Sequence, residues 1–252
     1  MPPPRRSDLV RPDLSRPDLA RPDLVREQAF QGLVIGIDEA GRGPWAGPVT
    51  VAAIWLDPAR YDEIPATLDD SKKLKPDTRE ALFNALTTST HIYSVISVPP
   101  AVIDASNILQ VTLQAMHDCA EDVAIKLQNA GQLEKAGHLE GAGHGTPLHM
   151  LVDGSIMPPI PAPPKIAGKM SGEAVIGGDG LSLSIAAASI IAKHTRDGIM
   201  TALDVDYPGY GWATNMGYGT KVHQEGLAML GVTPHHRKSY KPVKRILDQQ
   251  SD

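Results

Sequence analysis

The feature that most restricts the fold of this chain is an alternation of short apolar runs with longer segments of helical periodicity. Apolar and β-branched runs of four to eight residues, bounded by turn residues, predict buried strands. Apolar residues at steps of three, four and seven predict amphipathic helices. Strands interleaved with helices are typical of an α/β fold. The strands are expected at 33–37, 49–56, 91–98, 148–152 and 174–176.

The predicted helices lie between and after these strands. Proline is favoured in the first turn of a helix, and apolar periodicity continues from the proline pair at 99 and 100 to Leu127, so we expect one long helix there with Cys119 inside it. A Gly- and Pro-rich turn joins the first two strands, which predicts an antiparallel hairpin and hence a mixed sheet. The other helices are expected at 77–88, 183–204, 220–230 and 242–248.

A five-residue repeat containing proline occupies the N-terminal part of the chain, between residues 7 and 26. Proline at every fifth position excludes a continuous helix or a central strand. We therefore predict a disordered leader over 1–29, a single folded domain with a C-terminal helical region over 30–248, and a tail over 249–252.

The charge and composition narrow the class of protein. A formal charge of −5 argues against indiscriminate binding of nucleic acid. The single cysteine excludes an intramolecular disulfide and fits a reducing compartment. Since no apolar run approaches the roughly 18 residues of a membrane span, we expect a cytoplasmic protein.

Basic residues are nevertheless concentrated near the C-terminus, where a solvated helix end and a phosphate-binding surface explain them equally well. They are Arg237, Lys238, Lys241, Lys244 and Arg245.

Two loops are predicted in the second half of the chain. Residues 130–147 are rich in Gly and Ala, and His138, His144 and His149 lie in or beside them. The spacing of these histidines matches no standard zinc pattern, so we predict a surface loop. Residues 156–172 are rich in proline and are the second predicted loop.

Three of the predicted strands run into acidic residues. Asp38 and Glu39 follow the first strand, Asp153 follows the fourth, and Asp179 lies just after the fifth. Carboxylates past the ends of neighbouring strands converge at one edge of a sheet. Such a cluster needs cations, and all-oxygen ligation selects hard ions such as Mg²⁺ or Mn²⁺. For any single aspartate, a turn or a helix cap remains an alternative.

The turn after the first two acids is glycine-rich. Gly41 and Gly43 flank Arg42, and glycines let backbone amides approach a ligand closely. The turn lacks the spacing and the Lys-Ser/Thr pair of a nucleotide-binding loop. Taken alone, it fits a tight hairpin as well as a ligand-binding turn.

This stretch resembles the signature of the type HII ribonucleases, and further motifs resemble that family in the same order over about residues 33–247. The motifs are Asp38 to Pro44 continuing through Val49, Asp70-Ser71-Lys72-Lys73-Leu74, Asn107-Ile108-Leu109, Val152-Asp153-Gly154, Ser184 to Lys193 with Thr195-Arg196-Asp197, Gly217-Tyr218-Gly219-Thr220, and His236-Arg237-Lys238-Ser239.

The resemblance implies a ribonuclease H-like α/β fold, with a mixed central sheet flanked by helices and a C-terminal helical region. It implies a monomeric endonuclease that hydrolyses the RNA strand of RNA/DNA hybrids and cuts 5′ of single ribonucleotides in duplex DNA, leaving 3′-hydroxyl and 5′-phosphate ends. Its nucleic-acid partners would be those hybrids and duplexes, in ribonucleotide and RNA-primer removal. Two alternatives stay open: a type HIII-like hybrid nuclease and a nucleic-acid-binding protein without catalysis.

The resemblance also implies a catalytic and metal-binding site of Asp38, Glu39, Asp153 and Asp179, holding Mg²⁺ or Mn²⁺, with two ions at turnover. Two such ions roughly 4 Å apart activate a water and stabilise the leaving oxygen at a phosphodiester. Adjacent residues of a strand face opposite sides. We therefore expect Asp38, more than Glu39, to act as a side-chain ligand.

The family further implies how RNA is distinguished from DNA. The backbone of Gly41, Arg42 and Gly43 would contact the ribose 2′-hydroxyl, the group that marks RNA, and Tyr218 would stack on the sugar of the next deoxyribonucleotide. Further substrate contacts are expected from Ser71, Lys72, Lys73 and Arg196.

The sequence departs from the family at two positions where most relatives have lysine. These are Gly177, two residues before Asp179, and Met216, before the Gly-Tyr-Gly motif. Both departures remove positive charge near an anionic substrate, so we expect reduced affinity, or binding that is lost at lower salt.

Overall fold

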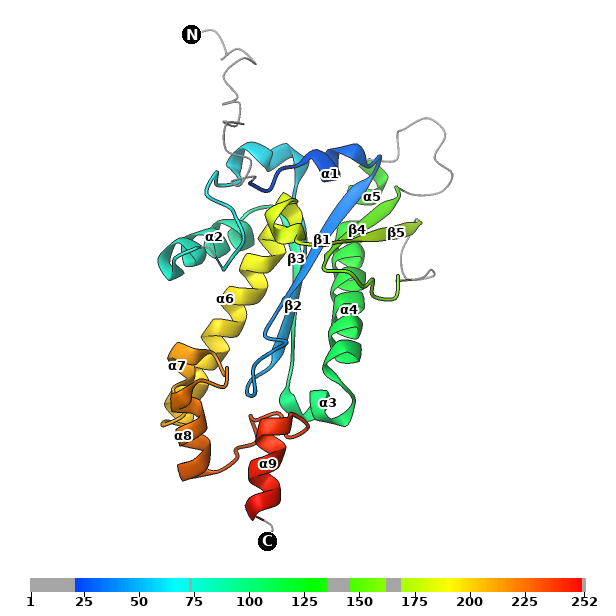
Figure 1. Ribbon diagram of the computed structural model, residues 1–252. Helices are drawn as coiled ribbons and strands as arrows, with labels where there is room; N and C mark the ends of the chain where they lie inside the picture. The colour runs from blue at the N-terminus through cyan, green and yellow to red at the C-terminus, as the bar shows by residue number, and fades with distance from the viewer. Residues whose placement is uncertain (1–20, 73, 136–145, 162–168, 251–252) are drawn as a thin grey trace.

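The computed structural model describes residues 21–72, 74–135, 146–161 and 169–250. At its centre is a five-stranded sheet with the strand order β3-β2-β1-β4-β5 (Figure 1). The first three strands pair antiparallel, whereas β1, β4 and β5 run parallel, which confirms the predicted mixed sheet. The strands are β1 (Leu33–Ala40), β2 (Val49–Trp55), β3 (Ile92–Val98), β4 (Leu148–Asp153) and β5 (Met170–Val175).

Helices cover both faces of the sheet, as Figure 1 shows. Helix α4 (Ile108–Asn129) packs on one face, where a core of apolar side chains from β1, β2 and β4 meets it. Helices α2 (Pro76–Thr88) and α6 (Leu183–Asp206) cover the other face. The predicted helices at 77–88 and 183–204 are thus confirmed.

The contact between β1 and α6 depends on a glycine. A Cβ atom at Gly36 would lie 2.2 Å from the backbone carbon of Ser184, so only glycine permits this approach. Because Gly36 and Asp38 lie two residues apart on one strand, they face the same side of the sheet. The close approach therefore brings the start of α6 near Asp38.

The predicted long helix from residue 99 to 127 is wrong in one respect, because it is two helices. Helix α3 (Pro100–Ala105) ends at Ser106, whose backbone is not helical (φ −133°, ψ −113°). The side chain of Asn107 then accepts a hydrogen bond from the amide of Gln110 and caps α4. An N-cap asparagine stabilises a new helix start more than continuation of the old one.

The leader predicted over 1–29 is wrong at its C-terminal end. Residues 25–29 form α1 (Val25–Ala29), and Glu27 is buried. Its carboxylate accepts hydrogen bonds from the Ser182 hydroxyl (2.6 Å) and from the amide and hydroxyl of Ser184 (2.9 and 2.7 Å). Residues 21–29 therefore belong to the folded domain, because they cap the start of α6. Residues 1–20 lie outside the described residues.

Two further boundaries differ from prediction. Strand β1 extends through Ala40, so Asp38 and Glu39 lie within the strand rather than beyond it. Strand β5 starts at Met170, not at 174, because residues 170–172 pair with β4; the predicted 156–172 loop is therefore shorter. His149 lies in β4 and stacks on Phe30, whereas His138 and His144 lie outside the described residues.

The C-terminal helical region lies beside the β1–β2 turn (Figure 1). It contains the predicted helix at 220–230 as α8, and α9 runs two residues beyond the predicted end at 248, into the predicted tail. Within the described ranges, no helix is long and apolar enough to cross a membrane. The remaining helices are η2 (Pro58–Glu63), α5 (Gln132–Lys135), η4 (Gly178–Gly180), α7 (Trp212–Asn215), α8 (Lys221–Leu230) and α9 (Lys241–Gln250).

Candidate active site

Three carboxylates converge at the carboxyl ends of the parallel strands. Asp38 lies on β1, Asp153 ends the neighbouring β4, and Asp179 lies in η4, which follows β5. One oxygen of each lies within 4.8 Å of an oxygen of the others. The spacing and all-oxygen chemistry of this group, called here the carboxylate cluster, fit a hard divalent cation.

The electrostatics of the carboxylate cluster favour a cation. Burial, and then the charges of Glu39 and Asp153, raise the pKa of Asp38 well above its usual value. Burial and the charge of Asp179 raise the pKa of Asp153. Like charges crowded in a poorly solvated site destabilise one another, and a cation relieves that repulsion.

Glu39 lies beside the cluster but is not a member of it. An extended strand directs adjacent side chains to opposite faces, and the Glu39 carboxylate accepts a hydrogen bond from Arg42 (3.2 Å). Its backbone amide donates to the Asp38 carboxylate (2.7 Å). Burial raises the pKa of Glu39 although Arg42 opposes the shift. This geometry agrees with the preference for Asp38 as the side-chain ligand.

Lys72 supplies positive charge to the cluster. Its ammonium group lies 3.1 Å from the Asp179 carboxylate, while most of the lysine side chain is exposed. Burial opposes the charge of Lys72, but the hydrogen bond to Asp179 and the nearby acids outweigh it and raise the pKa. Lys73 lies outside the described residues.

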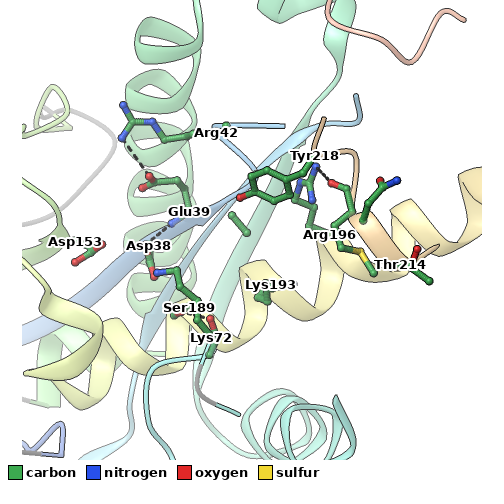
Figure 2. Close-up of a pocket in the computed structure, with 16 residues that line it drawn as sticks. Asp38, Glu39, Arg42, Lys72, Asp153, Ser189, Lys193, Arg196, Thr214 and Tyr218 are labelled. Atoms are coloured by element: carbon green, nitrogen blue, oxygen red, sulfur yellow. Dashed lines mark hydrogen bonds and ion pairs between the residues drawn. The ribbon is translucent and has the colours of Figure 1, made fainter. Parts of the chain in front are cut away.

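The carboxylate cluster opens into a cleft with a cavity volume of about 400 Å³. The predicted turn of Gly41, Arg42 and Gly43 lines this cleft, together with Tyr218. In Figure 2, Asp38, Asp153 and Glu39 lie on one side and Tyr218 on the other. The structure thus brings the predicted acids and the predicted turn to one site.

Tyr218 stands beside the turn and is exposed. A Cβ atom at Gly43 would lie 3.5 Å from the Tyr218 ring, and Tyr218 is 53% exposed. A half-exposed aromatic ring on the wall of a polar cleft is available to stack on a ligand.

Arg196 lines the cleft but its guanidinium is directed into the protein. It donates to the carbonyl oxygens of Pro48 (2.9 Å), Ala46 (3.2 Å) and Met216 (3.0 Å), the last drawn in Figure 2. Burial, and then the charge of Arg237, lower its pKa to about 10. Arg196 therefore joins the two loops that carry the turn and Tyr218. These bonds favour a structural role over the predicted substrate contact.

Ser71 is also buried, and its hydroxyl forms a 2.6 Å hydrogen bond with that of Ser189. Sequence reasoning missed Ser189 and Lys193, which line the cleft from α6. Lys193 forms an ion pair with Asp197. The signal was present, because positions 189, 193 and 196 are spaced by four and three residues and so place polar side chains on one face of the helix. Thr214 and Asn215 were missed as well.

Two buried histidines support the Tyr218 loop. The Thr233 amide donates to Nδ1 of His236 (3.0 Å), so the His236 proton lies on Nε2. That nitrogen donates to Nε2 of His223 (3.0 Å), which also accepts from Trp212 (3.2 Å). The His223 proton therefore lies on Nδ1 and is donated to the Tyr218 carbonyl (3.0 Å).

The structural reason for Gly177 is its backbone. Its φ of +66° lies in the left-handed region, which a lysine adopts at a cost. Met216 adopts φ +51°, a strained conformation for a residue with a side chain. Nothing in the structure explains why Met216 is not lysine.

The fold and the carboxylate cluster together define a class: enzymes of the ribonuclease H-like fold with an acidic site. Among solved structures, the ribonuclease H2 of Pyrococcus horikoshii matches with a TM-score of 0.64 at 23% identity, covering 87% of this chain and 99% of the other. A structure of Bst-RNase HIII in complex with Mn²⁺ matches with a TM-score of 0.62 at 17% identity, covering 88% and 71%. At these identities the likeness establishes the fold alone.

The sequence comparisons establish the family. The family model described as Ribonuclease HII matches residues 35–243. The Ribonuclease HII of Magnetococcus marinus is 45% identical over 213 residues, 84% of this chain and 86% of its own. That of a Jannaschia species is 42% identical over 221 residues, 88% and 96%. This chain belongs to the ribonuclease HII family. It is a ribonuclease H endonuclease of a divalent-metal-dependent family that acts on nucleic acid.

Proposed function

We propose that this enzyme cuts on the 5′ side of single ribonucleotides embedded in duplex DNA and also hydrolyses the RNA strand of RNA/DNA hybrids. The observation that carries the proposal is the presence of the carboxylate cluster and the turn 41–43 with Tyr218 in one cleft. A site that only bound nucleic acid would gain nothing from three mutually repelling acids. Cutting hybrids and embedded ribonucleotides would serve RNA-primer and ribonucleotide removal.

Asp38, Asp153 and Asp179 are the proposed metal ligands, for two ions, Mg²⁺ or Mn²⁺, at turnover. When bound, such ions polarise a water and neutralise charge on the phosphate. Asp153 is held by the Gly178 amide, which donates to its carboxylate (2.7 Å), and Asp38 by the Glu39 amide. We assign Glu39 an auxiliary role, since its carboxylate is bonded to Arg42.

The turn and Tyr218 supply the proposed specificity. Backbone amides of the turn would hydrogen-bond the 2′-hydroxyl, and the Tyr218 ring would stack on the next deoxyribose. An enzyme that recognises both a ribonucleotide and the deoxyribonucleotide after it needs only one ribonucleotide, at an RNA-to-DNA junction. Lys72 is exposed, and its ammonium group, which donates one hydrogen bond to Asp179, has further donors for a phosphate.

The relatives favour this proposal over the type HIII-like alternative. Several Ribonuclease HII relatives share 40–45% identity with this chain, whereas Bst-RNase HIII shares 17%. We further propose a cytoplasmic monomer. A single cysteine, which can form no intramolecular disulfide, fits a reducing compartment. That residue, Cys119, is buried, and burial raises its pKa to about 12, so its thiol is unreactive.

The test is cleavage of a labelled DNA duplex that contains one ribonucleotide, with Mg²⁺, Mn²⁺ or EDTA, beside the all-DNA duplex. We expect a metal-dependent cut 5′ of the ribonucleotide, with 3′-hydroxyl and 5′-phosphate ends and no cut in DNA. Cleavage of long hybrids but not of the one-ribonucleotide duplex would contradict the proposed recognition of an RNA-to-DNA junction. Products that end in a 2′,3′-cyclic phosphate would contradict the proposed attack by water.

A further inference from the structure

A buried arginine lies directly behind the cleft-lining turn. The guanidinium of Arg237 has no solvent exposure and donates to three backbone carbonyls. Nη2 donates to Gly41 (2.5 Å), Nη1 to Arg42 (2.8 Å) and Nε to Gly47 (3.0 Å). In the sequence, Arg237 belongs to a basic cluster that fits a solvated helix end or a phosphate-binding surface equally well. The structure separates it from its exposed neighbours.

Tyr240 reinforces the same contact. Its hydroxyl donates to the Arg42 carbonyl (2.6 Å) and accepts from Nη1 of Arg237 (2.9 Å). The carbonyls of Gly41 and Arg42 are therefore held from one side by three donors. Guanidinium suits this task because it carries five donors in a rigid plane and no acceptor.

The direction of these carbonyls fixes the direction of two amides. In a trans peptide, the C=O of one residue and the N–H of the next point in opposite directions. Since the carbonyls of Gly41 and Arg42 point to Arg237, the amides of Arg42 and Gly43 point away from it. Among the hydrogen bonds of the described residues, neither amide serves as a donor. Both residues line the cleft, so this donor pair is available to a ligand there.

The charge of Arg237 adds to the effect. Within the described part of the chain it forms no ion pair, since its hydrogen bonds go to carbonyls and to Tyr240. Successive N–H groups with a cation behind them favour an electron-rich oxygen. The arrangement therefore selects an acceptor atom in the cleft.

We propose that Arg237 and Tyr240 are positioning residues for ribonucleotide selection: they orient the amides of Arg42 and Gly43 toward the ribose 2′-hydroxyl. The inference rests on the proposed function and assigns its specificity to a buried support that does not touch the substrate. Displacing the amides should affect the ribonucleotide more than the rest of the duplex, whose affinity comes mainly from phosphate contacts.

The test compares Tyr240→Phe and Arg237→Gln with a matched control, Tyr210→Phe. The Tyr210 hydroxyl also donates to a backbone carbonyl, that of Gly231 (2.9 Å), in the same C-terminal region but away from the turn. Dissociation constants are measured in EDTA for a one-ribonucleotide duplex and for the all-DNA duplex of the same sequence. Thermal unfolding of each variant checks the fold, and kcat and KM are measured with Mg²⁺.

We expect wild type to prefer the ribonucleotide duplex. Tyr240→Phe should reduce that preference about threefold, the value of one ordinary hydrogen bond, and Arg237→Gln should abolish it. Affinity for all-DNA should stay within about twofold for Tyr240→Phe, and kcat should fall more than KM changes. Arg237→Lys should restore little, because an ammonium group cannot hold three carbonyls in one plane.

If Arg237 and Tyr240 only stabilise the fold, the two duplexes should be affected alike. Equal loss of affinity for both duplexes, or equal loss of preference in Tyr210→Phe, would overturn the proposal. So would a ribonucleotide preference that survives in Tyr240→Phe and in a folded Arg237→Gln. Absence of metal-dependent cleavage in wild type would instead contradict the proposed function, so the two failures are distinguishable.

Discussion

Two groups of polar side chains, nearly all buried, lie beside the same cleft and are arranged in opposite ways. In the carboxylate cluster, three like charges face one another, and burial raises the pKa of Asp38 and Asp153. The second group, called here the arginine–histidine group, consists of Arg196, His223, His236 and Arg237. Its members donate to backbone carbonyls or to one another.

The difference shows which group awaits a ligand. Buried polar groups that are hydrogen-bonded to their neighbours stabilise one local structure, whereas like charges crowded together repel one another and favour the binding of an opposite charge. The carboxylate cluster has only Lys72 as an ion-pair partner among the described residues. The arginine–histidine group is satisfied internally. The first is therefore the candidate metal site, and the second holds the turn 41–43 and the loop that carries Tyr218.

The largest expected effect comes from breaking the carboxylate cluster. Asp153→Asn keeps the shape and removes the charge, so we predict at least about a thousandfold loss of kcat, since metals supply several kcal/mol at 1.36 kcal/mol per factor of ten. Thermal stability in EDTA should be unchanged or higher, because repulsion is relieved. Single-turnover kinetics and thermal unfolding measure the two. Normal turnover by the folded variant would exclude Asp153 from the site.

A smaller effect is expected on the far wall of the cleft. Tyr218→Ala removes an exposed ring, so the unfolding free energy should change by less than about 0.5 kcal/mol. Loss of stacking should lower cleavage at a single ribonucleotide about tenfold. The rate on a continuous hybrid is the control. An unchanged junction rate would remove Tyr218 as the junction sensor.

The arginine–histidine group should make the unfolding free energy of the protein depend on pH. Burial, and then the charge of His223, lower the pKa of His236 to about 3, and His235 acts in the same direction. Below pH 6.5, His236 binds a proton in the unfolded chain but not in the folded chain. The contribution of His236 to the unfolding free energy therefore falls as the pH falls from 6.5 toward 3. The expected loss between pH 7 and pH 5 is about 2 kcal/mol.

Urea unfolding at several pH values measures this slope. His236→Asn, which lacks the titrating group, should show a shallower slope than wild type, even with a lower stability at pH 7. Equal slopes would mean that His236 does not contribute to the acid sensitivity. Burial also lowers the pKa of His223, so part of the slope should remain.

The smallest expected effect is a gain in affinity for nucleic acid. Met216→Lys adds a positive charge on the wall of the cleft, where the resemblance to the family implies a lysine. One added phosphate contact should steepen the plot of log affinity against log salt by about 0.9 and tighten binding severalfold at low salt. Affinity measured from low to high salt tests it. An unchanged slope would mean that position 216 faces no phosphate.

Much of the fold could be predicted because its strands and long helices carry their signal locally. The hairpin of β1 and β2 and helices α2, α6 and α8 follow from apolar periodicity. The break at Ser106 was missed because the apolar spacing runs across it, while the cap at Asn107 fits either a new helix or a polar residue in a continuous one. Helix α1 was missed because its stability depends on Ser182 and Ser184, far along the chain.

The acidic site could also be predicted from the sequence, because the strands can be recognised locally and acids at the ends of neighbouring strands meet at one edge of the sheet. The roles of Arg196 and Arg237 were not. A basic residue in a sequence is ordinarily solvated, and only the tertiary structure shows that both are buried beneath carbonyls of the turn region. The direction of each guanidinium depends on carbonyl oxygens of the turn between β1 and β2, which lie 148 to 196 residues away in the sequence.

The central claim, that the carboxylate cluster is the metal site and the arginine–histidine group is not, is tested most directly by a crystal structure with Mn²⁺ and a ribonucleotide-containing duplex. Anomalous scattering locates the ions without reference to activity. The account predicts ions coordinated by Asp38, Asp153 and Asp179 at about 2.2 Å from their oxygens. Ions held elsewhere, with these three carboxylates uncoordinated, would contradict it.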